Sequence, residues 1–539
     1  MLDLVFRGAT VVDGTGAPPF RADVGVAQGK IRRLGRVDDP ARETVDAGGL
    51  HLMPGIVDVH THYDAQVTWD PTLSPSVSLG VTTAVLGNCG FGIAPCPKPL
   101  RDTVLRNLSV VEGMDLDALL AGTHWQFETF GEYLDALERI GPYANLAVLA
   151  QHSTIRTAVM GEAASERKLP LAGELERMKA LVRDAMEAGA IGFASSFSPN
   201  HSGWAGRPMP STIAGDEELK ALAAVNTGVF VMATGSRATP QFMEAIAADS
   251  GRPAFMVTVL TMYNKAAPSR AMEYYERCAA ALERGHELYI HANCQPLSFD
   301  FTLREPYILY SHDAFDRVKA AAPDERAAIY RDPAFRARLK ENFSSPKPGI
   351  LFYGDWSQIE RDGVPVSELS SQPLDYVFDL PLDTQLVAKL YQNDDRGVAP
   401  LLRHRAGVIA LSDAGAHLSY FCDAGFGLHF LAHWVRETGS FTLEEGVRRL
   451  TSDPARKYRI PARGAIRAGN WADLVLFDAA KVGVGGLERA TDLPGGKFRM
   501  LRKPVGVHGV WVNGLSVFDG AKYVRRQSGP GAVLRKFDP

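Results

Sequence analysis

Two histidines that follow an apolar run are the strongest chemical signal in the sequence. The run Gly55–Val59 leads directly into His60 and His62, with Asp58 two residues earlier. Alternate side chains of a strand share a face, so both imidazoles can bind one cation while Asp58 orients a ring. Two polar residues in a strand-end turn are the alternative. The preceding apolar strand favours a metal site.

Cys89 occupies the corresponding place after the next apolar run. It lies among Gly87, Gly90 and Gly92, immediately after the run 82–86. A thiolate at a strand end can ligate a borderline metal at neutral pH, because the metal lowers its pKa. A lone cysteine is otherwise most often a buried structural thiol. Its position one strand after the two histidines favours a ligand.

Asp413 follows the last apolar run of the middle region, 408–412. In a closed barrel this strand neighbours the one that carries His60. The carboxylate can then contact the metal, take a proton from water and deliver it to a leaving nitrogen. An aspartate in a turn of small residues is the alternative interpretation. Together with the two histidines, Asp413 is predicted to be both a metal ligand and the catalytic base.

Eight short apolar runs are predicted to be the strands that position these residues. Most are followed by helical periodicity, for example Leu175–Met186 with a stop at Gly189. Eight is the number that a closed parallel barrel requires. The predicted strands are 56–60, 82–86, 145–150, 190–194, 229–234, 254–259, 287–291 and 408–412. The expected fold class is therefore α/β, with a (β/α)8 TIM-like barrel.

Both ends of the chain differ from this middle region. They consist of short strand-like runs, such as 4–6, 10–12 and 23–26 before the barrel and 473–477 and 507–514 after it. We expect the segments 1–53 and 461–539 to form one small β-sandwich domain. The barrel would span residues 54–460, with insertions near 97–140 and 292–400.

The order of these motifs resembles the amidohydrolase superfamily, and in particular its D-aminoacylase and N-acyl-D-amino-acid deacylase branch, in which a cysteine follows strand two. The resemblance covers nearly the whole chain. It is carried by residues 6–9, 12–16, 54–62, 132–134, 152–156, 451–455, 469–475 and 512–514, with Trp125 and Phe130. It implies a metal-dependent hydrolase that cleaves a carbon–nitrogen bond.

Strands five and six depart from that branch. In that branch, strands five and six usually each end in a histidine. These two histidines and the cysteine hold one metal, while the His-x-His pair and the aspartate hold another. Here the segments 229–237 and 254–261 contain no histidine, cysteine, aspartate or glutamate. What remains is His60, His62, Cys89 and Asp413, enough for one ion. We expect one zinc ion per chain, although these ligands also suit other divalent metals.

Four further residues are predicted to contact the substrate. His152 and His291 close strands three and seven, His417 follows Asp413, and Arg207 lies in the loop after strand four. An arginine can bind a carboxylate through two hydrogen bonds, and histidines can donate to a developing oxyanion. Each could instead be a core histidine or a solvated arginine, and the histidines could also be replacement ligands.

Composition limits the classes of function. The 539 residues are 46% hydrophobic and 22% charged, with a net charge of −4 and no long charged block. This profile disfavours nucleic acid and membrane surfaces as partners. No signal sequence or membrane-spanning run is evident, and five scattered cysteines suit a reducing compartment. The expectation is a cytoplasmic enzyme with a small-molecule amide substrate, and a homo-oligomer is compatible with the sequence.

The predicted function is hydrolysis of the amide bond of an N-acyl amino acid or N-acyl amine. A cyclic amidase or a deaminase of the same superfamily is the alternative enzyme. A binding protein that has lost its metal centre is a third interpretation. The joint presence of His60, His62, Cys89 and Asp413 argues against this third interpretation.

Overall fold

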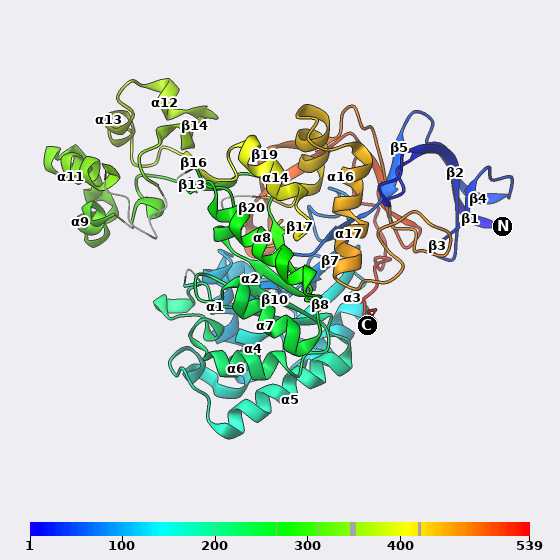
Figure 1. The fold of residues 1–539 in the computed structure, drawn as a ribbon, viewed down its shortest axis with the longest axis horizontal. Coiled ribbons are helices and arrows are strands. Elements are labelled where there is room, and N and C mark those ends of the chain that lie inside the picture. Colours follow the sequence, from blue (N-terminus) through cyan, green and yellow to red (C-terminus); the bar gives the residue numbers. More distant parts are fainter. Residues whose placement is uncertain (200, 266, 311, 345–351, 419–421, 539) are drawn as a thin grey trace. The chain divides into compact units, whose positions relative to one another are not determined.

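A parallel sheet of eight strands forms the centre of the computed structural model (Figure 1). The structure describes residues 1–199, 201–265, 267–310, 312–344, 352–418 and 422–538. The strands pair in chain order and are β6 (Ile56–Asp58), β7 (Val81–Leu86), β8 (Asn145–Gln151), β9 (Gly192–Ser196), β10 (Val229–Ala233), β11 (Ala254–Val257), β12 (Leu288–Ala292) and β17 (Gly407–Ile409). All eight coincide with strands predicted from sequence.

The first and last strands meet just beyond their ends. Thr61 forms a parallel bridge with Ala414, and the backbone N–H of His62 donates to the Ala414 carbonyl at 2.8 Å. The hydroxyl of Ser412 also donates to the carbonyl of His60 at 3.0 Å. This curled sheet is a TIM-like barrel, in which the carboxyl ends of all strands face one rim.

Helices follow most of the strands. In chain order they are α1 (Arg101–Val111), α2 (Leu116–Gly122), α3 (Phe130–Ile140), α4 (His152–Met160), α5 (Ala172–Ala188), α6 (Asp216–Ala223), α7 (Pro240–Ser250), α8 (Arg270–Glu283), α14 (Asp395–Arg403), α15 (Phe426–His429), α16 (Leu443–Leu450) and α17 (Ser452–Lys457). Helix α5 ends where the sequence predicts, because Gly189 adopts a φ of 108° that favours glycine.

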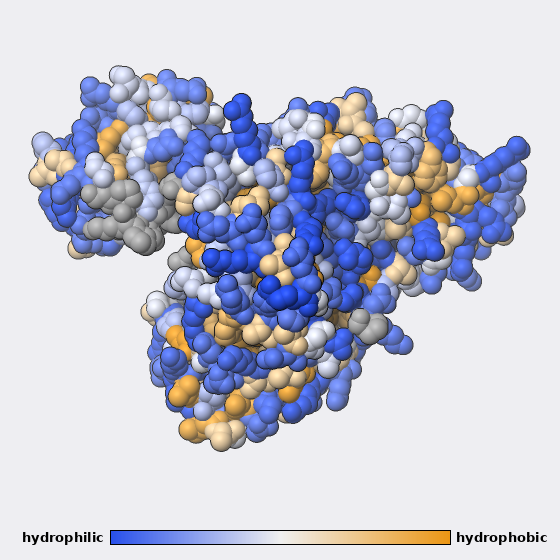
Figure 2. All heavy atoms as spheres, in the orientation of Figure 1, coloured by the Kyte–Doolittle hydropathy of each residue, from blue (hydrophilic) through white to orange (hydrophobic). Residues whose placement is uncertain are grey.

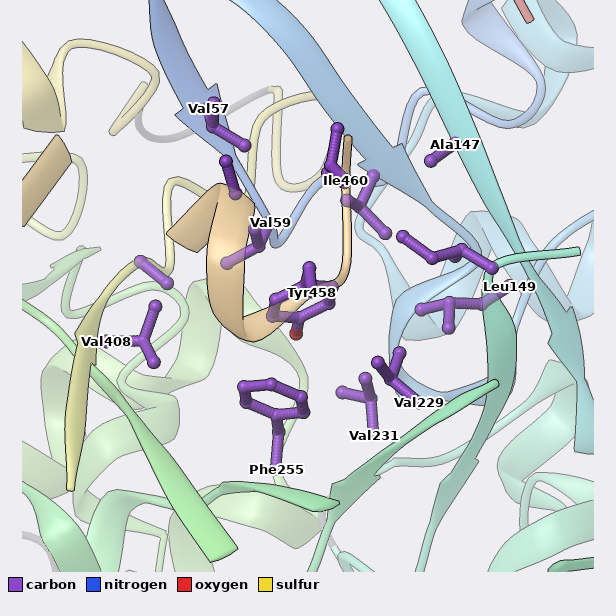
Figure 3. Packing of buried hydrophobic residues seen from close by; sticks show 14 of the residues in the cluster. Val57, Val59, Ala147, Leu149, Val229, Val231, Phe255, Val408, Tyr458 and Ile460 are labelled. Atoms are coloured by element: carbon purple, nitrogen blue, oxygen red, sulfur yellow. The ribbon is translucent and has the colours of Figure 1, made fainter. Parts of the chain in front are cut away.

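Branched and aromatic side chains fill the barrel interior (Figure 3). Val57, Val231 and Val408 come from three different strands and are all fully buried. Tyr458 joins them from the residue that follows α17, and its ring lies 4.3 Å from that of Phe255 between centroids. Burial of these apolar side chains is the main source of barrel stability.

Strands from the two ends of the chain share one sheet. Its members are β1 (Leu2–Val11), β2 (Phe20–Ala27), β3 (Lys30–Gly35), β4 (Ala41–Asp46), β5 (His51–Pro54), β18 (Leu474–Phe477), β21 (Val507–Val512) and β22 (Leu515–Phe518). Antiparallel pairing of β5 with β18 joins the N- and C-terminal segments, as expected. The sheet and the barrel belong to one compact unit, so the boundaries at residues 53 and 461 stay predictions.

Strand β1 corrects one detail of the sequence interpretation. Residues 4–6 and 10–12 were expected as separate strands, but Leu2–Val11 is continuous. Its pairing with β2 shifts register between Phe6 and Ala9, where Gly8 has a φ of 65°. A bulge at this glycine therefore replaces the predicted break, since glycine adopts positive φ without steric cost.

A long hairpin in the C-terminal segment was not predicted. Strands β19 (Gly483–Leu493) and β20 (Lys497–Val505) pair only with each other among the described strands. The N–H of Met500 donates to Leu418 at 2.7 Å, and Arg499 donates to the Ser74 carbonyl at 2.8 Å. The C-terminal segment therefore also contacts barrel loops that follow strands one and eight.

Residues 262–268 and 295–398 form a second compact unit. Its sheet contains β13 (Leu297–Phe301), β14 (Ile359–Arg361), β15 (Val364–Pro365) and β16 (Leu386–Tyr391), and its helices are α9 (Asp316–Ala320), α10 (Arg326–Arg331), α11 (Pro333–Ser344), α12 (Val366–Leu369) and α13 (Pro373–Phe378). The rings of Phe315, Tyr330, Phe335 and Phe378 pack together in its core. Most of the unit lies within the insertion expected near 292–400.

Candidate metal centre

The four residues predicted as ligands lie together at the rim of the barrel. Ligand atoms of His60, His62 and Cys89 are all within 4.8 Å of one another, and all three residues are buried. The Oδ1 atom of Asp413 lies 3.2 Å from Nε2 of His60 and 3.5 Å from Nε2 of His62. The Sγ atom of Cys89 is 3.7 Å from Nε2 of His60. Two imidazoles, a thiol and a carboxylate thus converge on one point.

The positions of these donor atoms depend more on irregular backbone after the strands than on the alternation of side chains along a strand. Strand β6 ends at Asp58, before either histidine. The Oδ1 atom of Asp58 accepts the backbone N–H of His60 at 3.2 Å, so this carboxylate holds the chain rather than an imidazole ring. Strand alternation therefore does not by itself bring His60 and His62 together, and Asp58 contacts the backbone instead of orienting a ring as expected.

The turn that carries Cys89 depends on glycine. Gly87, Cys89 and Gly90 have φ values of 83°, 55° and 74°. A Cβ atom at Gly87 would lie 2.6 Å from the Leu149 carbonyl oxygen, and one at Gly90 would lie 2.7 Å from that of Ala194. These close approaches require glycine and turn the thiol toward the histidines.

The charges of the cluster suit a cation. Burial alone would raise the pKa of Asp413, but hydrogen bonds and charges from His60 and His62 hold it well below its ordinary value. The same two histidines outweigh burial at Cys89 and lower the pKa of its thiol. Against burial, Asp413 and Cys89 raise the pKa of His60 to about 9. A bound cation would take the place of the histidine protons, so its binding would release protons.

Glu112, at the end of α1, is a functional candidate that sequence reasoning missed. Its Oε1 atom lies 3.1 Å from Nδ1 of His62, and its side chain is 5% exposed. Because a carboxylate only accepts, the Nδ1–H of His62 donates to it and leaves Nε2 free to bind a metal. Burial raises the pKa of Glu112 to about 7, against the opposing charge of His62.

Comparison with known proteins identifies the family. A sequence profile of the amidohydrolase family matches residues 43–277 and 379–518. The chain belongs to the amidohydrolase family. It is accordingly a hydrolase of carbon–nitrogen bonds other than peptide bonds. A curated relative, the N-acyl-D-glutamate deacylase of Alcaligenes xylosoxydans xylosoxydans, is 29% identical, and the alignment covers 99% of this chain and 97% of the relative.

Two solved structures of deacylases resemble this amidohydrolase over 99% of its length and 100% of theirs. One is the N-acyl-D-glutamate deacylase of Bordetella bronchiseptica with zinc and a phosphonate inhibitor that mimics the tetrahedral intermediate, with a TM-score of 0.68 and 26% identity. The other is a D-aminoacylase whose binuclear metal centre shows one-metal activation and second-metal attenuation, with a TM-score of 0.67 and 25% identity. Metal dependence is thus a property of the neighbouring enzymes.

His291 contacts the cluster through His60. Its Nδ1 atom lies 3.1 Å from Nδ1 of His60, and its Nε2 atom lies 2.6 Å from the hydroxyl oxygen of Tyr458. Burial, assisted by the charge of His60, holds the pKa of His291 well below its ordinary value. Both ring nitrogens thus have protein partners, and a role in substrate binding stays a prediction.

His152 lies in a different buried network of the amidohydrolase. Its Nδ1 atom is 2.8 Å from the Ser195 hydroxyl, and its Nε2 atom is 2.9 Å from a carboxylate oxygen of Glu218. Glu218 also accepts from Arg156, and all these side chains are buried. The network links the ends of β8 and β9 to α6, and contact of His152 with a substrate stays a prediction.

The two remaining substrate candidates differ in position. The backbone N–H of His417 donates to the Glu112 carbonyl, and burial lowers the pKa of its imidazole while the charge of Asp413 opposes this. His417 therefore lies beside the metal cluster. Arg207 is half-exposed and forms an ion pair with Glu162 at 2.8 Å. The structure gives this arginine a protein carboxylate as its partner, and substrate binding stays a prediction for both.

Figure 2 shows mostly hydrophilic residues on the face it displays, with scattered hydrophobic ones. Within the described ranges, no helix has the combined length and apolarity needed to cross a membrane. The expectations of a cytoplasmic location and of a homo-oligomer stay predictions.

Proposed function

We propose that this amidohydrolase is a deacylase of N-acyl amino acids or N-acyl amines that works with one divalent metal ion. The observation that supports this is the convergence of His60, His62, Cys89 and Asp413 at the barrel rim. The similar deacylases cover nearly the whole chain, which favours an acyclic amide over a ring as substrate.

The residues of the cluster fit a zinc ion. Both histidines present Nε2, while Nδ1 of each has a partner on the other side of the ring. Such outer partners orient histidine ligands. Against the effect of burial, the two histidines lower the pKa of the Cys89 thiol and of the Asp413 carboxyl, which shifts both groups toward the anionic forms that ligate metals. When bound, the ion supplies Lewis-acid activation of the scissile carbonyl and of a water molecule.

The proposal of one metal ion per chain is supported by two strands whose ends lack metal-binding side chains. In strands β10 and β11 the positions beyond the strand end include Thr234 and Thr258 but no histidine. Apart from His60, His62 and Cys89, the described residues contain no group of three or more histidine, cysteine or acidic side chains at ligand spacing. We therefore expect a single tightly bound ion.

Asp413 is the proposed base and acid. It has 30% of its side chain exposed, whereas His60 and His62 are 1% and 4% exposed. The open side of the cluster is thus at this carboxylate. One oxygen takes the proton from the attacking water and returns it to the leaving nitrogen, so the carboxylate is unchanged after one turnover.

The substrate class is tested with a panel assayed on metal-replete, full-length protein. The panel contains N-acyl amino acids of both configurations, N-acyl amines, aryl amides, hydantoins and aminopyrimidines. We expect turnover of an N-acyl amino acid or N-acyl amine, but weak turnover of simple N-acetyl-D-amino acids, since strands five and six differ from those of ordinary deacylases. Preferred turnover of a hydantoin or an aminopyrimidine would refute the deacylase proposal and leave the amidohydrolase assignment intact.

A further inference from the structure

A chain of three hydrogen-bonding groups leads from the metal cluster into the barrel core. Nδ1 of His60 faces Nδ1 of His291 at 3.1 Å, and Nε2 of His291 faces the Tyr458 hydroxyl at 2.6 Å. His60 and His291 are 1% exposed and Tyr458 is fully buried, so water cannot replace any of these contacts. Figure 3 shows Tyr458 between Val59 and Phe255, inside the barrel.

The two histidine ligands differ in what determines their tautomers. In its carboxylate form Glu112 only accepts at Nδ1 of His62, so it keeps the proton there and frees Nε2. The partner of His60 is another imidazole, which can donate or accept at Nδ1. The tautomer of His60 therefore depends on the group at the far nitrogen of His291, which is the Tyr458 hydroxyl.

Only one direction of hydrogen bonding along His60, His291 and Tyr458 allows His60 to bind a metal through Nε2. In that direction His60 Nδ1–H donates to His291, and His291 Nε2–H donates to the Tyr458 oxygen. If Tyr458 donated to His291 instead, His291 would donate to His60 and the remaining proton of His60 would occupy Nε2. Nε2 is the atom that faces Cys89 and Asp413, so this second direction blocks the metal site.

We infer that Tyr458 and His291 are positioning residues that set the metal-binding tautomer of His60. This inference rests on the proposed metal centre and adds residues that do not touch the ion. In the metal-binding direction, the Tyr458 hydroxyl must donate its own hydrogen elsewhere.

Asp58 is a charged neighbour of this hydroxyl. Its Oδ2 atom is buried and makes no hydrogen bond to the described residues. Burial raises the pKa of Tyr458 well above its ordinary value, and the charge of Asp58 raises it further.

The test is zinc affinity of the full-length protein, measured by competition with a chromogenic chelator. Tyr458→Phe removes only the hydroxyl and keeps the ring that packs on Phe255. Its zinc affinity should fall about 10-fold or more, which is the range for outer-shell partners of a ligand. Tyr275→Phe is the matched control, because Tyr275 is fully buried and its hydroxyl has no hydrogen-bond partner. The control should bind zinc like the unmodified protein.

A double-mutant cycle separates this role from a structural one. His291→Phe should weaken zinc binding at least as much as Tyr458→Phe, and the double variant should bind no more weakly than His291→Phe alone, because Tyr458 acts through His291. His291→Gln retains an acceptor and a donor and should recover part of the lost affinity. A purely structural role would instead lower the unfolding temperature of the metal-free protein without changing zinc affinity.

The zinc affinities of these variants decide whether the inference holds. Unchanged zinc affinity in folded Tyr458→Phe overturns the inference, as do additive losses in the cycle. If Tyr458→Phe does not fold, the comparison of His291→Phe with His291→Gln decides, and equal affinities overturn the inference. His60→Ala tests the metal centre itself. If His60→Ala retains zinc affinity, the proposed centre fails, whereas a loss in His60→Ala with none in Tyr458→Phe refutes the tautomer role alone.

Discussion

Replacing Asp413 by asparagine should lower kcat by about 100-fold or more. Asparagine keeps the size of the side chain but cannot take a proton from water or return one to nitrogen. Against the effect of burial, hydrogen bonds and charges from His60 and His62 hold the pKa of Asp413 well below its ordinary value and so favour its carboxylate form. The measurement is kcat of metal-loaded protein on the best substrate of the panel, with metal content determined in the same sample.

Asp135→Asn is a suitable control for this prediction. Asp135 lies on α3, is 53% exposed and forms an ion pair with Arg535. Its replacement should leave kcat unchanged, because an Asp-to-Asn change on the surface does not affect the metal cluster. Near-normal turnover by a folded, metal-loaded Asp413→Asn variant would remove Asp413 from the role of base.

Replacing Cys89 by serine should weaken zinc binding by more than the roughly 100-fold that the loss of an outer-shell partner can cause. Serine fits the same turn but does not ionise near neutral pH, so the cluster loses an anionic ligand that the two histidines stabilise. Activity should fall with metal content and return in part at high zinc concentration. Chelator competition and a zinc titration of activity measure the two effects.

Cys96→Ser provides the matched comparison. Cys96 is also buried, but it lies outside the cluster of His60, His62 and Cys89, and burial raises the pKa of its thiol to about 12. Its Sγ–H donates to the Pro97 carbonyl at 3.8 Å, a contact that a hydroxyl can also make. Equal zinc affinities in the Cys89 and Cys96 variants would exclude Cys89 from the metal site.

The barrel and the proximity of the candidate ligands could be predicted because their signals are local. Each strand is a short run of buried apolar residues, and the polar residues that follow, such as His60, Cys89 and Asp413, must meet where parallel strands end. The family resemblance gave the same assignment. Neither argument depends on details of the loops.

Glu112 could not be predicted because nothing in its neighbourhood marks it. It follows an ordinary helix, α1, and reaches His62 only because the insertion after strand two folds back over the rim. The contact between His60 and His291 is similar, since it needs barrel closure to bring together residues 231 positions apart. Long-range contacts of this kind leave no periodicity in the sequence.

The hairpin β19–β20 was missed for a different reason. Pro494, Gly495 and Gly496 form a turn signal between its strands, but most side chains of both strands are exposed or only partly buried. A two-stranded ribbon without a buried face lacks the alternation of apolar and polar residues by which strands are recognised. The sequence favours Arg207 as a substrate ligand because an arginine can bind a carboxylate, but it does not reveal that Glu162 offers one within the protein.

Hydrolysis should require one metal ion at one catalytic centre, and a titration of activity with zinc measures this requirement. The purified full-length protein is stripped with a chelator and zinc is returned in known amounts while hydrolysis of the preferred substrate is followed. Activity should be absent without metal and should rise linearly to a plateau at about one equivalent of zinc per chain, in agreement with elemental analysis. A plateau at two equivalents, or full activity in the stripped protein, would refute the proposal of one catalytic metal ion per chain.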